Sequence, residues 1–120
     1  MEIYSQNLAT ISALADDRDR SATVRERLSR AQMLHDRGRL LEARDRAAEV
    51  VDELLRADAD ARRYLAKACG LLGMILYRLD DLPGARDHTA AAIAAGREAG
   101  DDVAVVIYTA NLDVIDRHTR

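Results

Sequence analysis

Apolar residues recur at every third or fourth position along most of the chain, which is the spacing of one face of an α-helix. Leu8, Ile11 and Leu14 follow this spacing in residues 3–15. A longer stripe in residues 40–57 is apolar throughout, while the positions between its members are mostly charged. This pattern is typical of a helix that packs on a core with one face and meets water with the other. The stripe consists of Leu40, Ala43, Ala47, Val50, Val51, Leu54 and Leu55.

Local signals divide the chain into six predicted helices. A glycine after an apolar stretch is the usual left-handed residue just past a helix C-terminus, which applies to Gly38 and Gly100. Thr23 followed by Glu26 has the spacing of a capping box at a helix N-terminus. Pro83 suits the first turn of a helix, where a missing N–H costs nothing. The predicted helices span about residues 3–15, 23–38, 40–57, 61–79, 83–99 and 102–117.

Composition supports an all-α fold class. The chain has 22 Ala, 15 Leu and a single Pro, and its only aromatic residues besides histidine are four Tyr. Strands favour β-branched and aromatic residues on their pleated faces, whereas Ala and Leu are strong helix formers. A chain of 120 residues can bury one core. We therefore expect a single helical domain over residues 1–120.

Charge and cysteine content exclude several function classes. The formal net charge is −3, so no overall positive field attracts nucleic acid or anionic lipid. The longest uncharged apolar run, residues 68–77, falls well short of the roughly 18 residues that cross a bilayer. The single cysteine, Cys69, cannot form an internal disulfide, and the first residues lack the features of a secretory signal. We expect a cytoplasmic protein that binds neither nucleic acid nor membrane.

The sequence repeats itself at an offset of 42 residues. This shift aligns Leu34 with Leu76, Leu40 with Leu82, and the Ala-Arg-Asp of residues 43–45 with that of residues 85–87. Each unit contains two predicted helices and is therefore a helical hairpin. The units span approximately residues 23–59 and 61–100, with partial flanking units at 1–17 and 101–118.

Small residues and leucines recur at matching places in these hairpins. The members in the central unit are Leu72, Gly73, Leu76, Ala85 and Ala92. With them the sequence resembles the tetratricopeptide family, and its long period resembles the variant found in kinesin light chains and bacterial transcriptional regulators. Cys69 and Thr89 depart from the family pattern, because they stand where aromatic residues are usual. The resemblance implies antiparallel hairpins stacked as a short right-handed superhelix.

Candidate catalytic residues do not assemble into a known motif. His35, His88 and His118 fall on different predicted helices and have no metal-binding partner at i+3 or i+4. Cys69 lies among leucines on the apolar face of its helix, where a packed, inert thiol is expected rather than a nucleophile. No nucleophile elbow, phosphate-binding glycine loop or zinc-binding helix motif is present in the sequence. We expect no catalytic site and no cofactor.

Three pairs of adjacent aspartates stand between predicted helices, at residues 16–17, 80–81 and 101–102. Paired carboxylates could bind a metal ion, but no third ligand shares a regular spacing with any of them. Aspartate is also a favoured N-cap, and its charge is stabilised at a helix N-terminus. The pairs therefore predict helix caps, and no metal site is expected.

The family resemblance implies a peptide-binding groove lined by the first helix of each hairpin. The positions that would face it are Arg25, Gln32, His35 and Asp36 on one helix and Lys67, Gly70, Met74, Tyr77 and Arg78 on the next. Three cations against one carboxylate would suit an acidic or carboxylate-terminated peptide. In this interpretation Gly70 leaves space for a ligand. The alternative is that these residues form an ordinary solvated helix face.

The predicted helix at residues 102–117 carries two apolar stripes on nearly opposite sides. Val103, Val106, Ile107, Ala110 and Val114 form the stripe that we expect to pack on the preceding helix. Val105, Tyr108, Leu112 and Ile115 form the second stripe, which would then be exposed. Exposed apolar patches are usually covered, and closed symmetry favours a homodimer held through residues 103–116.

Two functions from different classes remain after the sequence is read. The favoured one is a non-catalytic adaptor or scaffold that binds a partner protein or peptide and associates with itself. The alternative is a regulatory or sensory module that responds to a peptide or small metabolite and controls a transcription factor or an enzyme. A small all-α enzyme is the least favoured interpretation, because no residues satisfy the geometric roles of an active site.

Overall fold

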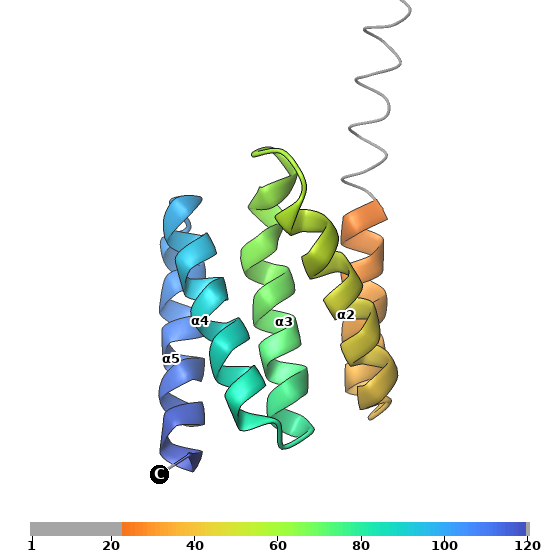
Figure 1. Cartoon of the computed structure of the whole chain (residues 1–120), viewed down its shortest axis with the longest axis vertical. Coiled ribbons are helices and arrows are strands. Elements are labelled where there is room, and N and C mark those ends of the chain that lie inside the picture. The colour runs from red at the N-terminus through yellow and green to blue at the C-terminus, as the bar shows by residue number, and fades with distance from the viewer. Residues whose placement is uncertain (1–22, 120) are drawn as a thin grey trace, which may run out of the picture.

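Helices account for all the regular structure between residues 23 and 119, the part of the chain that the computed structural model describes (Figure 1). Residues 23–36 are helical, and four further α-helices follow: α2 (Leu40–Leu55), α3 (Leu65–Arg78), α4 (Leu82–Glu98) and α5 (Asp102–His118). The predicted all-α class is thus confirmed for these residues, in which five of the six predicted helices fall. The predicted helix at residues 3–15 and the aspartates at 16–17 lie outside the described residues. None of the described helices is long and apolar enough to cross a membrane.

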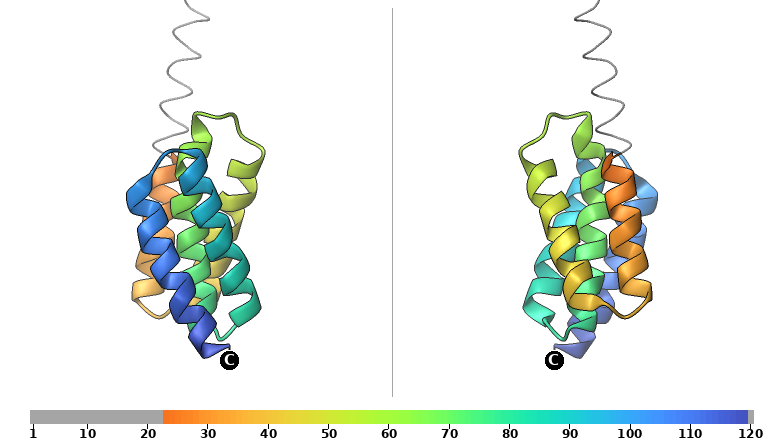
Figure 2. Two further views of the ribbon diagram at one scale, coloured as in Figure 1. Left: turned by 90° about the vertical axis from the view of Figure 1, so that its left-hand side faces the viewer. Right: turned by 90° about the vertical axis from the view of Figure 1, so that its right-hand side faces the viewer.

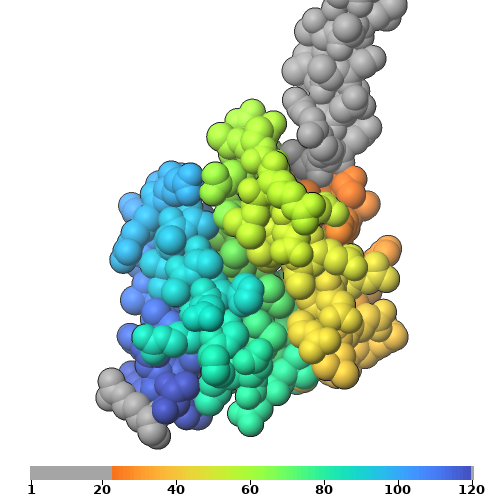
Figure 3. Space-filling view, viewed as in Figure 1, coloured from red at the N-terminus to blue at the C-terminus, as the bar shows by residue number. Residues whose placement is uncertain are grey.

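The helices stack side by side, and consecutive helices run in opposite directions. The 23–36 helix and α5 lie at opposite edges of the stack, with α3 in the middle (Figure 1). The two side views show α2 and α4 on one side of the molecule and the 23–36 helix and α5 on the other (Figure 2). Figure 3 shows the face that α2 and α4 form, with α3 between them.

The turn after each of three helices has the same geometry. Gly38, Asp80 and Gly100 all have positive φ angles, of 79°, 64° and 69°. The next residue donates its backbone N–H to a carbonyl five residues earlier, as Arg39 does to Leu34 at 2.9 Å, Asp81 to Leu76 at 2.9 Å and Asp101 to Gly96 at 2.8 Å. This is the Schellman motif, which pairs carbonyls that a helix end leaves without partners. The predicted helix ends at Gly38 and Gly100 are confirmed.

Two of the aspartate pairs cap helices. Asp81 accepts a hydrogen bond from the backbone N–H of Gly84 at 3.0 Å, and Asp101 accepts one from Ala104 at 3.1 Å. No group of three acidic, histidine or cysteine side chains among residues 23–119 could hold a metal ion. Thr23 is already helical, so the prediction that it caps the second helix is wrong. The predicted helix at 61–79 differs at its start, where a short 3-10 helix (Ala61–Tyr64) precedes α3.

Small residues set the distances between helices. Ala43 in α2 and Ala85 in α4 are both fully buried and stand 42 residues apart. A Cβ atom on Gly73 of α3 would lie 3.3 Å from the Ala85 carbonyl oxygen and 3.2 Å from the Thr89 nitrogen. The α3 and α4 backbones therefore approach as closely as they do because residue 73 has no side chain. Buried side chains from all five helices join in one apolar cluster.

The packing of α5 is the reverse of the sequence-based expectation. Ile115 is 3% exposed and Tyr108 is half-buried, although both belong to the stripe predicted to face outward. The stripe predicted to pack on α4 is instead exposed, with Val103 at 68%, Val106 at 69% and Ile107 at 50%. Val105 and Leu112 are likewise partly buried, whereas Ala110 and Val114 are exposed. Val105, Tyr108, Leu112 and Ile115 consequently form the inner face of α5.

Candidate functional site: a groove across three helices

An open groove of about 440 Å³ lies between the 23–36 helix, α3 and α5. Five of the nine residues predicted to face a shared groove line it: Gln32, Asp36, Lys67, Gly70 and Met74. They come from helices that are separated in sequence by α2, so the stacking of the hairpins brings them together. The structure therefore brings five of the nine predicted residues to one groove and leaves the other four outside its lining.

The apolar part of the groove was missed by the sequence analysis. Met33 is 41% exposed and Ile107 is 50% exposed, and both line the groove together with Met74. Buried Leu28 and Leu71 form its floor, while Ser29 and Asn111 add polar groups. The exposed α5 residues could not be assigned to the groove from the sequence, because the orientation of that helix was predicted the wrong way round.

The Tyr108 side chain of α5 occupies the space above Gly70. A Cβ atom on Gly70 would overlap the Tyr108 ring, so the absence of a side chain at residue 70 admits this ring. Burial raises the pKa of the Tyr108 phenol, and the nearby Asp101 carboxylate adds to the shift. The proposal that Gly70 clears space for a ligand is thus replaced by a contact within the chain.

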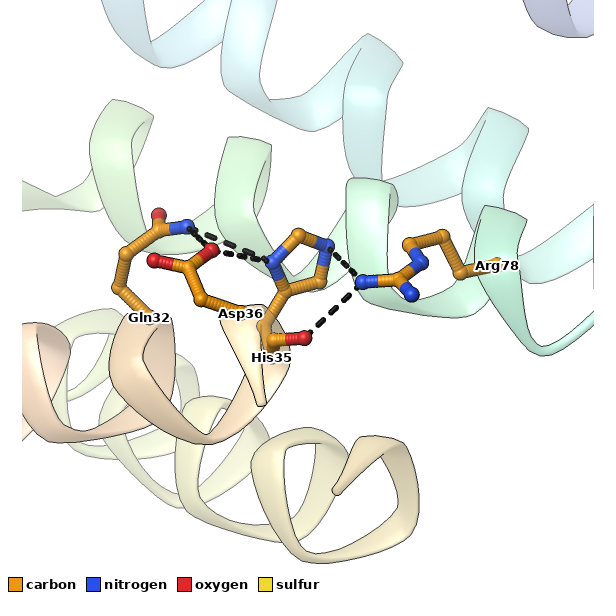
Figure 4. Close-up of polar contacts among 4 residues, drawn as sticks. All are labelled: Gln32, His35, Asp36 and Arg78. Atoms are coloured by element: carbon orange, nitrogen blue, oxygen red, sulfur yellow. Dashed lines mark hydrogen bonds and ion pairs between the residues drawn. The ribbon is translucent and has the colours of Figure 1, made fainter. Parts of the chain in front are cut away.

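A polar cluster at one end of the groove engages two of the other predicted residues (Figure 4). Arg78 Nη1 donates to the His35 carbonyl oxygen at 2.9 Å and lies 3.3 Å from His35 Nε2. The guanidinium can only donate, so Nε2 is the acceptor and Nδ1 carries the proton toward Asp36 Oδ1, at 3.0 Å. Arg78 therefore joins α3 to the C-terminal end of the 23–36 helix, where carbonyls lack helical partners.

The same cluster holds Asp36 in its ionised form. Gln32 Nε2 donates to Asp36 Oδ1 at 2.9 Å and also lies 3.4 Å from His35 Nδ1. The hydrogen bonds from Gln32 and then His35 lower the pKa of the Asp36 carboxyl below its ordinary value of 3.8. The side chains of His35 and Arg78 thus have partners within the chain, which the sequence analysis did not foresee.

Arg25 and Tyr77 line two hollows next to the groove and not the groove itself. The described lining residues of the hollow at Arg25 all belong to its own helix, and two of them also line the groove. The Tyr77 hydroxyl lies 3.1 Å from His118 Nδ1 of α5, and the two rings meet edge to face with centroids 5.4 Å apart. Of the four residues predicted to share one groove, Arg25, Lys67, Tyr77 and Arg78, the structure places Lys67 alone in it.

The charge in the groove is correspondingly small. Among its described lining residues Lys67 is the only cation and Asp36 the only carboxylate. Cys69 lies close by on α3 but is 2% exposed. Burial raises the pKa of its thiol to about 11, so the reactive thiolate is scarce at neutral pH. The groove can offer apolar contact, amide hydrogen bonds and one ammonium group to a ligand.

Comparison with known proteins gives no match to a family model, to a curated protein or to a solved structure. The repeat and the geometry of the groove are therefore the features that bear on function.

Proposed function

We propose that this protein is a non-catalytic adaptor whose stacked hairpins form a short tetratricopeptide-like superhelix. Support comes from helix starts and turns that recur 42 residues apart, which is the offset of the sequence repeat. Leu40 begins α2 and Leu82 begins α4, while Gly38 and Asp80 adopt the same left-handed geometry 42 residues apart. Close packing at Gly73 and Ala85 is the second feature that such hairpins need.

The observation that carries the proposal is the groove lined by Met33, Met74 and Ile107. Methionine side chains are flexible and polarisable, so they adapt to apolar side chains of different shapes. Lys67 stands beside them as the one cation among the described lining residues. The ligand that fits this arrangement is a peptide segment of a partner protein with apolar side chains and an acidic group that reaches Lys67.

Methyl NMR of the methionines tests this function directly. The chain has three methionines, of which Met33 and Met74 line the groove and Met1 does not belong to the described residues. Peptides would be selected by display on the wild-type protein and counter-selected on Met74→Glu. We expect the selected peptides to combine apolar and acidic residues and to shift the Met33 and Met74 methyl signals.

A charge reversal at Lys67 supplies the matched comparison. Lys67→Glu should weaken an acidic peptide about tenfold or more, because attraction becomes repulsion at the groove. Arg97→Glu makes the same change at an exposed position of α4 and should leave binding unchanged. Peptides that bind wild type and Met74→Glu equally well would contradict the proposal. If a small molecule rather than a peptide shifts the two methyl signals, the sensory-module alternative replaces the adaptor.

A further inference from the structure

The exposed stripe of α5 is a second surface with a chemistry of its own. It consists of Val103, Val106, Ile107, Ala110 and Val114. Only Ile107 also lines the groove, and Val114 lines a smaller hollow beside it. Single exposed valines are common on proteins, but a continuous stripe along one helix usually marks an interface. We propose that this stripe binds the same stripe of a second copy of the chain, with the two α5 helices antiparallel.

The positions that align with this stripe at the 42-residue offset are buried elsewhere in the molecule. Ile107, Ala110 and Val114 align with Leu65, Ala68 and Leu72 of α3 at the 42-residue offset. Those three residues are 6%, 0% and 3% exposed, because α3 has a neighbouring helix on each side. Helix α5 lies at the edge of the stack, and its equivalent side chains are exposed (Figure 1).

The two ends of α5 carry opposite charges, which favour pairing with an antiparallel α5 helix of a second copy. Asp102 stands in its first turn and Arg117 in its last. Neither residue forms an ion pair with any other residue between 23 and 119. Within the stripe Ala110 is the smallest side chain, so two helices can cross most closely there.

A two-fold axis at Ala110 brings these charges together. Val103 lies seven residues before Ala110 and Arg117 seven residues after it. In an antiparallel pair each Arg117 would therefore lie opposite Val103 of the partner subunit and next to Asp102 of the partner subunit. The interface would contain two copies of this ion pair, one at each end of the apolar contact.

Mass measurement across a concentration range tests the association. We expect the full chain to pass from 13.3 kDa to twice that mass as it is concentrated from low to high micromolar. Val106→Glu should weaken the dimer about tenfold or more in Kd, because it places an unpaired carboxylate in the apolar contact. Thr109→Glu adds the same charge to an exposed position of α5 outside the stripe and should leave the dimer intact.

Disulfide crosslinking tests the antiparallel geometry. Cys69 is buried, so a cysteine introduced on the surface is the accessible thiol. Ala110→Cys should crosslink to itself across the axis under mild oxidation. A mixture of Val103→Cys and Arg117→Cys proteins should form the mixed disulfide in preference to either homodimer.

Three outcomes would overturn the proposal. One is a wild-type chain that stays monomeric over the whole concentration range. Another is a dimer that Val106→Glu leaves unchanged while Leu8→Asp or Ile11→Asp disrupts it, which would locate the contact in residues 3–15 instead. The third is preferential self-crosslinking of Val103→Cys, which would show a parallel pair. Circular dichroism of each variant distinguishes loss of association from loss of folding.

Discussion

The ring of Tyr108 in α5 lies directly over Gly70 in α3, in space that any side chain at residue 70 would occupy. This contact joins two helices that are separated in sequence by the whole of α4. The ring can lie there because α3 has no Cβ atom at residue 70.

We predict that Gly70→Ala destabilises the protein by about 1–3 kcal/mol, the usual cost of forcing extra atoms into a packed contact. In a Tyr108→Ala background the sign should reverse. There the added methyl group meets no ring, and Ala is favoured over Gly in a helix by about 1 kcal/mol. Chemical denaturation of the four proteins measures this coupling. An equal loss of stability in both backgrounds would show that the ring does not cause the effect.

Arg78 and Lys67 should behave differently although both were predicted to bind a ligand. Arg78→Ala removes the hydrogen bond to the His35 carbonyl and should lower the free energy of unfolding by about 1–2 kcal/mol. Lys67→Ala removes an exposed side chain from the same helix and should change it by less than about 0.5 kcal/mol. Thermal unfolding of the two variants makes the comparison. Similar stabilities would mean that the Arg78 contact contributes nothing to the fold.

The pKa of Asp36 reports on the polar cluster. Its carboxyl should titrate below 3.8 in the folded protein, because Gln32 and His35 donate hydrogen bonds to the ionised form. A lowered pKa stabilises the fold above the pKa of the unfolded chain, and this stability is lost as the pH falls through the folded value. Carboxyl-detected NMR should show the pKa rising toward 3.8 in Gln32→Ala. Arg37→Ala, an exposed neighbour outside the cluster, should leave it where it is.

A substitution in the turn between α3 and α4 should make the protein more stable. Asp80 has a φ of 64°, whereas the equivalent residues in the other two Schellman turns are glycines. Asp80→Gly should therefore stabilise the protein by about 0.5–1 kcal/mol. Glycine relieves the backbone strain of the folded state, and the greater conformational entropy of the unfolded chain offsets part of this gain. The reciprocal change, Gly38→Ala, should cost about 1 kcal/mol through the backbone alone, because no atom lies within 4 Å of the new Cβ. Denaturation midpoints that move in the same direction would contradict this explanation.

Part of the groove could be predicted and part could not. Gln32, Lys67 and Met74 were among the groove positions that the family resemblance implies, and the repeat carries these positions from one helix to the next. Arg78 and His35 were assigned to a ligand, since the pattern of a single chain does not show which polar groups satisfy one another. The sequence did not indicate that Met33 and Ile107 line the groove, because an apolar residue on a helix is predicted to be buried until its neighbours are known.

The sequence by itself determined the five described helices, most of their ends and the period of their repetition. These depend on local chemistry: left-handed glycines, aspartate caps and the apolar spacing of residues three or four apart. Only the tertiary structure decided which side of α5 faces inward, because this helix has an apolar stripe on each of two nearly opposite sides. The inner side is the one whose shape fits the neighbouring helices. The ring of Tyr108 lies over Gly70, and Val105 packs against Gly96, where its Cγ2 atom would lie 3.2 Å from an added Cβ. The inner stripe is therefore the one that fits the recesses left by two glycines on other helices.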